Sequence, residues 1–481
     1  MKILTPTSRL LSLGAIGLTV ASAIQAQNLI DSKPWSLRFS QQGFYTDNVF
    51  SRSFGNSPRF DANGTPVMTS VFEPTPGKPG EFREKMETVT VNGLPVSRPV
   101  LTPVLGFGKV AKVQSYGFEI SPGFSVRLPI NDGQTTLSFS YDYLLRYFDN
   151  RPKSADHNHT VNVGLVHNFD SKNKLEVTDS FVVAQEPEQL GTGSGAAPIT
   201  FRAEGSNVRN IAGFDFSSQL SERWSSTFGL RNNYFSFEND SLQDSLGRYE
   251  NLPSANARFL LTPSTSLGLL YQFGMTRYDG SVSKVRDLNS HFVAGTIDVD
   301  FGPNVKTSLR GGIQVNDFAD PIGYTDRDGV TPYADALVSY SFASGSSLAL
   351  GVRHQVSVTD VGAVPINGDN ILNVGKDGLD PIRGSSATSA RISLLSEISP
   401  NLLGAISGIY QIGTFIGGGP TVDGQNDAYA SIDLSLTYRL TQNVGIRGSF
   451  AHDRVESDLS FLSDSRPFSR NRVYLGVNFS Y

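Results

Sequence analysis

The sequence predicts an all-β fold: a transmembrane antiparallel β-barrel of the outer-membrane type, with about eighteen strands and both termini on the periplasmic side. Three observations lead to this prediction. Runs of alternating apolar and polar residues recur along the chain, short and long connections alternate between the runs, and the last strand ends in an aromatic residue. The runs number about eighteen, among them Thr135–Phe148, His159–His167, Trp224–Phe237 and Val444–His452. Single-chain bacterial barrels have an even number of strands.

The C-terminal residues 472–481 form the strand on which the prediction depends most. Its apolar side holds Val473, Leu475, Val477, Phe479 and Tyr481, and its other side holds Arg472, Tyr474, Gly476, Asn478 and Ser480. Because most domains end in frayed residues, this ending favours the closing strand of a barrel over an ordinary sheet strand. In such barrels the assembly machinery reads a polar or aromatic residue, a glycine and two aromatics, which here are Tyr474, Gly476, Phe479 and Tyr481.

The connections between the runs give independent support. Short turns such as Ser221–Arg223 and Ser399–Asn401 alternate with long polar connections such as Glu186–Gly205 and Thr359–Arg383. This is the asymmetry of periplasmic turns and external loops. A sandwich or propeller has no reason to place all its long loops at one end, and a β-solenoid would show a repeat of fixed length. A plugged transporter needs about 22 strands and an N-terminal plug, for which the chain leaves no room.

The N-terminus predicts export. Lys2 and Arg9 precede an apolar run, Leu10–Val20, and small residues follow as far as Ala26. This is the pattern of a secretory signal peptide, and the run is shorter than the roughly 20 residues of a spanning helix. We expect residues 1–26 to be cleaved, with Ala23 as an alternative site, and residues 27–481 to form a single barrel in the outer membrane.

Composition excludes several classes of function. The chain has no cysteine, so disulfides, thiol catalysis and cysteine metal sites are excluded. The net charge of −5 argues against nucleic acid as a partner. We expect no cofactor and no enzymatic activity, because the sequence shows no catalytic constellation. His157 and His159 lie beside a predicted loop, where a solvated loop is favoured over a weak metal site.

Charged residues on the less apolar side of the strands are candidates for the lumen, since the apolar side should meet lipid. The predicted lumen residues are Arg146, Arg209, Arg231, Arg258, Arg310, Arg353, Arg391, Arg439, Arg447 and Arg472, with Asp142, Asp215, Asp298, Asp335 and Asp433. The arginines could steer anionic solutes through a water-filled passage. Arginine–aspartate pairs that brace the inner wall are the alternative that we favour, because both signs are present.

The first long connection, residues 46–111, is far longer than usual, and such loops are usually functional or disordered. Within it, Glu87–Val96 predicts a small hairpin around Asn92-Gly93. The loop could fold into the pore as a constriction or stand outside as a cap. The sequence leaves both alternatives open.

Several stretches resemble the outer-membrane beta-barrel porin family of the second type, found in Gram-negative bacteria. They are Gly43–Phe50, Tyr116–Phe124 and Leu137–Tyr147, followed by His157-Asn-His159. The resemblance is clearest over Trp35–Val183 and implies an outer-membrane barrel. Members are often encoded with exopolysaccharide systems, so the resemblance also implies a polysaccharide role. It brings no binding residue, and the long first loop departs from the family pattern.

We therefore expect a porin-like channel for passive passage of hydrophilic solutes. The alternatives are an exopolysaccharide export conduit and a non-conducting barrel that anchors surface structures. The expected partners are outer-membrane lipid and lipopolysaccharide, the barrel assembly machinery, and a hydrophilic solute or polysaccharide.

Overall fold

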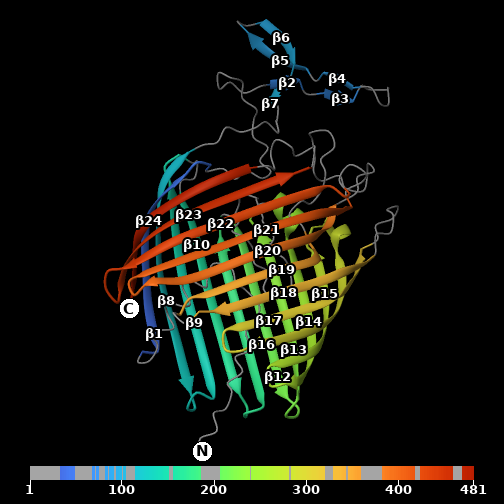
Figure 1. Ribbon diagram of the computed structural model, residues 1–481. Coiled ribbons are helices and arrows are strands. Elements are labelled where there is room, and N and C mark those ends of the chain that lie inside the picture. Colours follow the sequence, from blue (N-terminus) through green and yellow to red (C-terminus); the bar gives the residue numbers. More distant parts are fainter. Residues whose placement is uncertain are drawn as a thin grey trace, which may run out of the picture.

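The wall of the molecule is one eighteen-stranded antiparallel sheet that closes on itself (Figure 1). The computed structural model describes residues 33–48, 114–150, 155–185, 206–238, 240–280, 283–319, 329–342, 345–358, 382–417, 423–458 and 468–481, together with six short strands between residues 68 and 103. β1 pairs with both β8 and the C-terminal strand β24, and the pairing of β1 with β24 closes the barrel. The predicted closed barrel is confirmed. The predicted signal peptide, residues 1–26, lies outside the described residues.

Each wall strand runs antiparallel to its two neighbours. The eighteen strands are β1 (Trp35–Thr46), β8 (Ser115–Ile130), β9 (Thr135–Phe148), β10 (Ala155–Asn168), β11 (Asn173–Ala184), β12 (Asn207–Gln219), β13 (Trp224–Phe237), β14 (Arg248–Thr262), β15 (Thr265–Tyr278), β16 (Leu288–Phe301), β17 (Val305–Phe318), β18 (Gly329–Ser341), β19 (Ser347–Ser357), β20 (Ile382–Ser399), β21 (Leu402–Gly417), β22 (Asn426–Arg439), β23 (Val444–Ser457) and β24 (Phe468–Ser480). Most observed strands extend a few residues beyond the predicted runs. Hydrogen bonding continues past the point where apolar and polar residues stop alternating.

The outer face is apolar, as the alternation predicts. On β24, Val473, Leu475 and Val477 are 47–65% exposed. Tyr474, on the other face of the same strand, packs against the buried rings of Phe44 and Phe148. Exposed apolar side chains thus mark the face that points away from the interior, and their neighbours in sequence point inward.

Gly476 has a structural role where the barrel closes. It lies opposite Gln42 in the β1–β24 ladder. A Cβ atom at this position would lie 2.2 Å from the backbone oxygen of Gln41 and 2.4 Å from the Cβ of Gln42. Only glycine allows this close approach of the two backbones.

The long connection between β1 and β8 contains six short strands: β2 (Met68–Ser70), β3 (Phe72–Pro74), β4 (Phe82–Glu84), β5 (Met86–Val91), β6 (Leu94–Pro99) and β7 (Leu101–Pro103). They form three two-stranded sheets, and β5 pairs with β6 from Val91↔Leu94 outward. The two strands of the predicted hairpin are therefore present, and its turn, Asn92-Gly93, lies outside the described residues. In Figure 1 these strands lie beyond the end of the barrel where β1 ends and β8 begins, outside the wall.

Two short helical segments complete the described chain, α2 (Asp240–Leu246) and the 3-10 helix η1 (Ser283–Arg286). They belong to the connections after β13 and β15, at the end of the barrel with the long connections. Among the described residues, helices that are long and apolar enough to cross a membrane are absent.

Candidate functional site

The inner face of the wall changes from open to filled along the barrel. On β17 the inward side chains from the short-turn end upward include exposed Lys306 and half-buried Arg310, followed by Gln314 and Phe318, which are 1% and 3% exposed. On β13 the inward side chains likewise become less exposed toward the long-connection end, where Asn233 and Phe235 are fully buried. The interior is therefore accessible from the short-turn end and narrow at the long-connection end.

One cause of the narrowing is a break between β18 and β19. Their pairing ends at Ala334↔His354, whereas β18 stays paired with β17 as far as Gly329, and β19 with β20 as far as Ser357. Continuing the register would place Pro332 opposite Val356. Proline has no N–H to donate to a ladder, so the two strands part here.

The carboxamide of Gln314 replaces the missing strand partner. The backbone N–H of Val356 donates to Oε1 of Gln314 over 2.9 Å, and Nε2 of Gln314 donates to the carbonyl of Val356 over 3.1 Å. Nε2 also donates to Asn316 Oδ1, which accepts a second bond from the Ser290 hydroxyl. These side chains are at most 4% exposed, so the bonds meet the requirement that buried polar groups find partners.

The ends of β19 and β20 pack inward as a result. Val356, whose position in the alternation predicts an outward side chain, is buried with Leu288 and Phe318. The guanidinium of Arg383, at the start of β20, lies 6.0 Å from the ring of Phe318. Val358 reaches the cluster formed by Phe235, Phe237 and Leu246 from β13 and α2. We call the inward-packed residues 355–358 and 382–385 the constriction segment.

Two buried arginines lie at the same end of the barrel. Arg248 is fully buried, its Nε donates to Glu250 Oε1 over 2.8 Å, and its guanidinium stacks 4.3 Å from the ring of Phe235. Arg286 in η1 lies 4.5 Å over the ring of Tyr278. Sequence reasoning missed both residues, because their burial comes from α2 and η1 and not from any local pattern.

The predicted lumen residues occupy the face opposite the exposed apolar side chains. Many of them form ion pairs, either with one another or with Arg38, Glu119 or Asp453, which the prediction did not include. The ion pairs on the inner wall include Arg38–Asp142 at 2.9 Å, Arg146–Glu119 at 2.5 Å, Arg231–Asp215 at 3.9 Å, Arg258–Asp298 at 2.7 Å, Arg353–Asp335 at 2.5 Å, Arg391–Asp335 at 3.9 Å and Arg472–Asp453 at 2.9 Å. Arg209, Arg310, Arg439, Arg447 and Asp433 follow the same alternation. These pairs are cross-strand contacts, which is the geometry of a braced wall.

Positive charge is in excess on β17–β20. Arg310 lies opposite Asp335 in the register, and Asp335 in turn pairs with Arg353 and Arg391. The hydroxyl group of Tyr333 also interacts electrostatically with the guanidinium of Arg391. Three guanidinium groups therefore face one carboxylate directly below the constriction segment.

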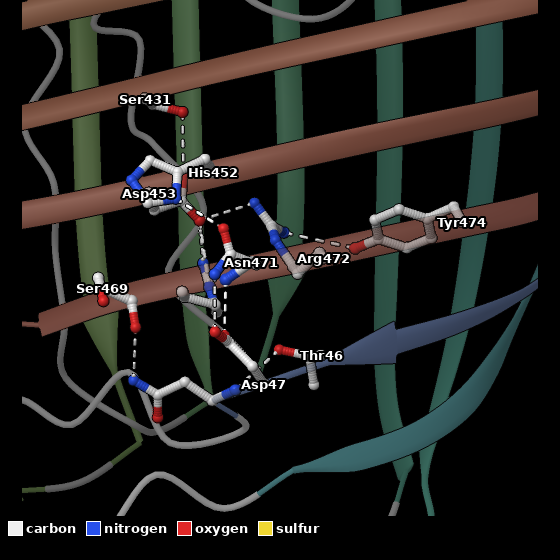
Figure 2. A network of polar contacts seen from close by, with 11 residues as sticks. Thr46, Asp47, Ser431, His452, Asp453, Ser469, Asn471, Arg472 and Tyr474 are labelled. Atoms are coloured by element: carbon white, nitrogen blue, oxygen red, sulfur yellow. Dashed lines mark hydrogen bonds and ion pairs between the residues drawn. The ribbon is translucent and has the colours of Figure 1, made fainter.

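A network of polar contacts joins the long-connection ends of β1, β23 and β24, where the barrel closes (Figure 2). Asp47, just after β1, accepts two 2.7 Å bonds from the backbone and side chain of Asn471 on β24. Asp453 on β23 accepts from Arg470, Arg472 and the Ser431 hydroxyl, each over 2.9 Å. Segments more than four hundred residues apart are thus joined side by side.

The interpretation of His157 and His159 as part of a solvated loop is wrong. Both lie in β10 and point outward, where Nδ1 of each bonds a tyrosine hydroxyl of β9, Tyr143 for His157 and Tyr141 for His159. The predicted run in this region begins only at His159, because His157 and Asn158 are both polar and apolar residues do not mark the outward side there. Among the described residues, groups that could hold a metal ion are absent.

Comparison with known proteins gives a limited result. No family model and no curated protein matches the chain. Among solved structures, OccAB4 of Acinetobacter baumannii is 12% identical with a TM-score of 0.40, covering 94% of this chain and 99% of that one. The outer membrane protein OpdK of Pseudomonas aeruginosa is 11% identical with a TM-score of 0.41, covering 93% and 99%. The siderophore receptor PirA of the same organism is 9% identical with a TM-score of 0.38, covering 92% and 80%. At these values the likeness carries no argument about function.

Proposed function

We propose that the chain is a passive channel of the outer membrane for small hydrophilic solutes, narrowed at its long-connection end by the constriction segment. The observation that carries this proposal is the inner wall: polar and charged side chains line it, and they pass from exposed to buried along β13 and β17. A barrel of about eighteen strands is wide enough for an aqueous passage. A narrow charged segment then selects among solutes.

The outer face supports membrane insertion. Exposed aromatic residues gather at the short-turn end, including Trp35, Trp224 and Phe301. Such a girdle marks a membrane interface. We place this end on the periplasmic side and the long connections outside, which agrees with a cleaved signal peptide at residues 1–26. The partners would be outer-membrane lipid, lipopolysaccharide and the assembly machinery.

The charge below the constriction segment supports a preference for anions. Arg310, Arg353 and Arg391 exceed the single carboxylate of Asp335. Guanidinium groups bind carboxylates and phosphates in paired geometry, so a solute with such a group would be favoured over a cation. Elsewhere on the wall, Arg38, Arg146, Arg231, Arg258 and Arg472 pair with carboxylates and act as braces.

A second candidate is a conduit for a polysaccharide, as the family resemblance implies. One observation favours it: the rings of Phe292 and Tyr333 meet on the inner wall at 5.7 Å, edge to face. Sugar rings pack on aromatic faces, so the half-buried ring of Phe292, backed by the buried Tyr333, could support a saccharide chain that passes the arginines.

Conductance in a planar bilayer tests the proposal with the full chain. We expect steady open steps and, in a salt gradient, a reversal potential that indicates anion preference. The Arg310→Gln Arg391→Gln variant should lower that preference, whereas the control Arg38→Gln, on β1, should change it less. Absence of steps at all voltages would contradict a channel and favour the anchoring alternative. Steps that appear only on addition of a saccharide chain would favour the conduit.

A further inference from the structure

The outer wall carries a polar seam where lipid is expected. Asp179 on β11, Asn210 on β12, Asn232 on β13 and Asn251 on β14 all lie on the outward face. Outward neighbours in the same strands are Phe181, Phe214 and Leu230, which are 39%, 43% and 48% exposed. We call Asp179, Asn210, Asn232 and Asn251 the polar seam. It crosses four adjacent strands within an apolar surface.

The members of the polar seam bond to one another in pairs. Nδ2 of Asn210 donates to Oδ1 of Asp179 over 2.8 Å, and Nδ2 of Asn232 donates to Oδ1 of Asn251 over 2.8 Å. Among the described residues, Asp179 Oδ2 accepts no hydrogen bond. Each asparagine amide still has a second N–H to donate, so both donors and acceptors remain available at the surface.

The depth of Asp179 makes an unpartnered carboxylate costly. It is the seventh of the twelve residues of β11, counted from the short-turn end. A rise of about 3.3 Å per residue and a tilt of about 40° place it roughly 15–18 Å above that end, inside an apolar band about 25 Å tall. Ionisable residues in the hydrocarbon are rare and usually have a partner. Acyl chains offer none.

We propose that the polar seam is the contact surface for a second copy of this chain, arranged about a two-fold axis. A two-fold interface is self-complementary, so the same patch meets itself. Asp179 supplies acceptors and the three asparagines supply donors, and a copy turned through two-fold symmetry brings donors opposite acceptors. The exposed apolar residues Val163, Phe181 and Phe214 lie around the polar seam and supply apolar surface for the two walls to pack.

A second copy fits this surface better than lipid does. A headgroup phosphate would meet the carboxylate of Asp179 with like charge, and acyl chains would leave its oxygen unsatisfied. On the opposite wall, outward positions of β21 and β22 are apolar over a comparable stretch, with Ile412, Ile432 and Leu434 exposed. The asymmetry distinguishes β11–β14 from a wall that faces only lipid. The inference rests on membrane insertion and not on conduction.

The mass of the purified full chain in lipid nanodiscs tests the proposal. We expect a dimer for the natural chain and a monomer for the Asp179→Leu Asn210→Leu variant. The control Thr388→Leu removes an outward polar group on β20, which bonds His354, and should leave the dimer unchanged. A monomeric natural chain, a mass other than that of a dimer, or a dimer that survives the double substitution overturns the proposal.

Crosslinking tests it without altering the polar seam. The chain has no cysteine, so a single introduced thiol reports only its own surroundings. Ala212 lies opposite both Asp179 and Asn232 in the register. A short bifunctional maleimide should join Ala212→Cys chains in membranes at twice the chain mass. Ala334→Cys, outward on β18, should remain single. Equal crosslinking of both, or of neither, overturns the proposal, whether or not the barrel conducts.

Discussion

Two strand junctions in this wall behave in opposite ways. β24 and β1 are the most distant wall strands in sequence, yet their ladder runs without a break from Arg38↔Ser480 to Thr46↔Arg472. β18 and β19 are consecutive, yet they part above Ala334↔His354. Proximity in sequence therefore does not decide where the wall is sealed.

Single residues account for the difference. At the closing junction Gly476 allows the backbones of β24 and β1 to meet, and Asp47 ties the upper end to Asn471. At the parted junction Pro332 removes a donor, and Gln314 holds the end of β19 inside the barrel. One junction closes the barrel, and the other narrows its interior.

The largest effect is expected from Gly476→Ala, which breaks the closing junction. A methyl group would overlap the backbone of β1, and overpacking of this kind costs about 1–3 kcal/mol or more. Folded protein, measured by the shift in electrophoretic mobility on heating, should fall to a small fraction. The control is Gly448→Ala on β23, where the nearest atom to a Cβ is 4.0 Å away. Equal folding of the two variants would contradict the role of close approach.

A smaller loss of assembly is expected from Tyr481→Asp, which alters the lower end of the same junction. The Tyr481 ring lies 5.6 Å from Trp35, with Lys33 Nζ 3.7 Å above it. A carboxylate removes these contacts and the terminal aromatic that we expect the assembly machinery to read. The variant should accumulate in the periplasm when cell fractions are probed. Phe342→Asp, at an exposed aromatic of the short-turn end, is the control; an equal defect there would exclude a special role for the last residue.

Gln314→Leu tests the parted junction. The variant leaves the N–H and carbonyl of Val356 without their partner, and an unsatisfied buried group costs about 1–3 kcal/mol. The constriction segment should then loosen, so single-channel steps should become larger and noisier while the barrel still assembles. Gln272→Leu, also inward on β15, should leave the steps unchanged. Identical steps in all three proteins would show that Gln314 does not shape the passage.

The smallest effect is expected at the turn Asp170–Asn173 between β10 and β11. This turn lies outside both junctions and outside the membrane-spanning segments. Hydrogen bonds from the Asn173 side chain and from the backbone N–H groups of Lys172 and Asn173 lower the pKa of Asp170. A lowered pKa stabilises the turn above the usual carboxyl pKa, and that contribution is lost as the pH falls through the lowered value. Asp170→Asn should reduce the urea midpoint slightly at pH 7. The difference from the natural chain should vanish in strong acid; a difference independent of pH would contradict this.

The sequence predicts the strands of the wall well, because the alternation of apolar and polar residues along one strand is a local property of the sequence. The alternation of Thr135–Phe148 and Trp224–Phe237 is set by one apolar outward face and one polar inward face, so both strands match the predicted runs to the residue. The inward positions of Arg258 and Asp298 follow from the same period. Their 2.7 Å contact depends on the registers of β14 and β16 with β15, which lies between them.

The constriction segment could not be predicted in this way. The alternation places Val356 outward, and its burial depends on Gln314, 42 residues earlier in the chain. The burial of Arg248 and Arg286 likewise depends on how two connections fold over the interior. The first long connection, which the sequence offers as a constriction or a cap, contributes short strands outside the wall (Figure 1).

A single lumen thiol offers the most direct test of an aqueous passage. Ser407 on β21 points inward opposite Asp433, and Ala390 on β20 points outward opposite Tyr410. We would record single-channel current of Ser407→Cys before and after a charged thiol reagent, with Ala390→Cys as control. A stepwise fall in current for Ser407→Cys alone is the predicted result. Current that is absent, or that the reagent leaves unchanged in Ser407→Cys, would contradict the channel.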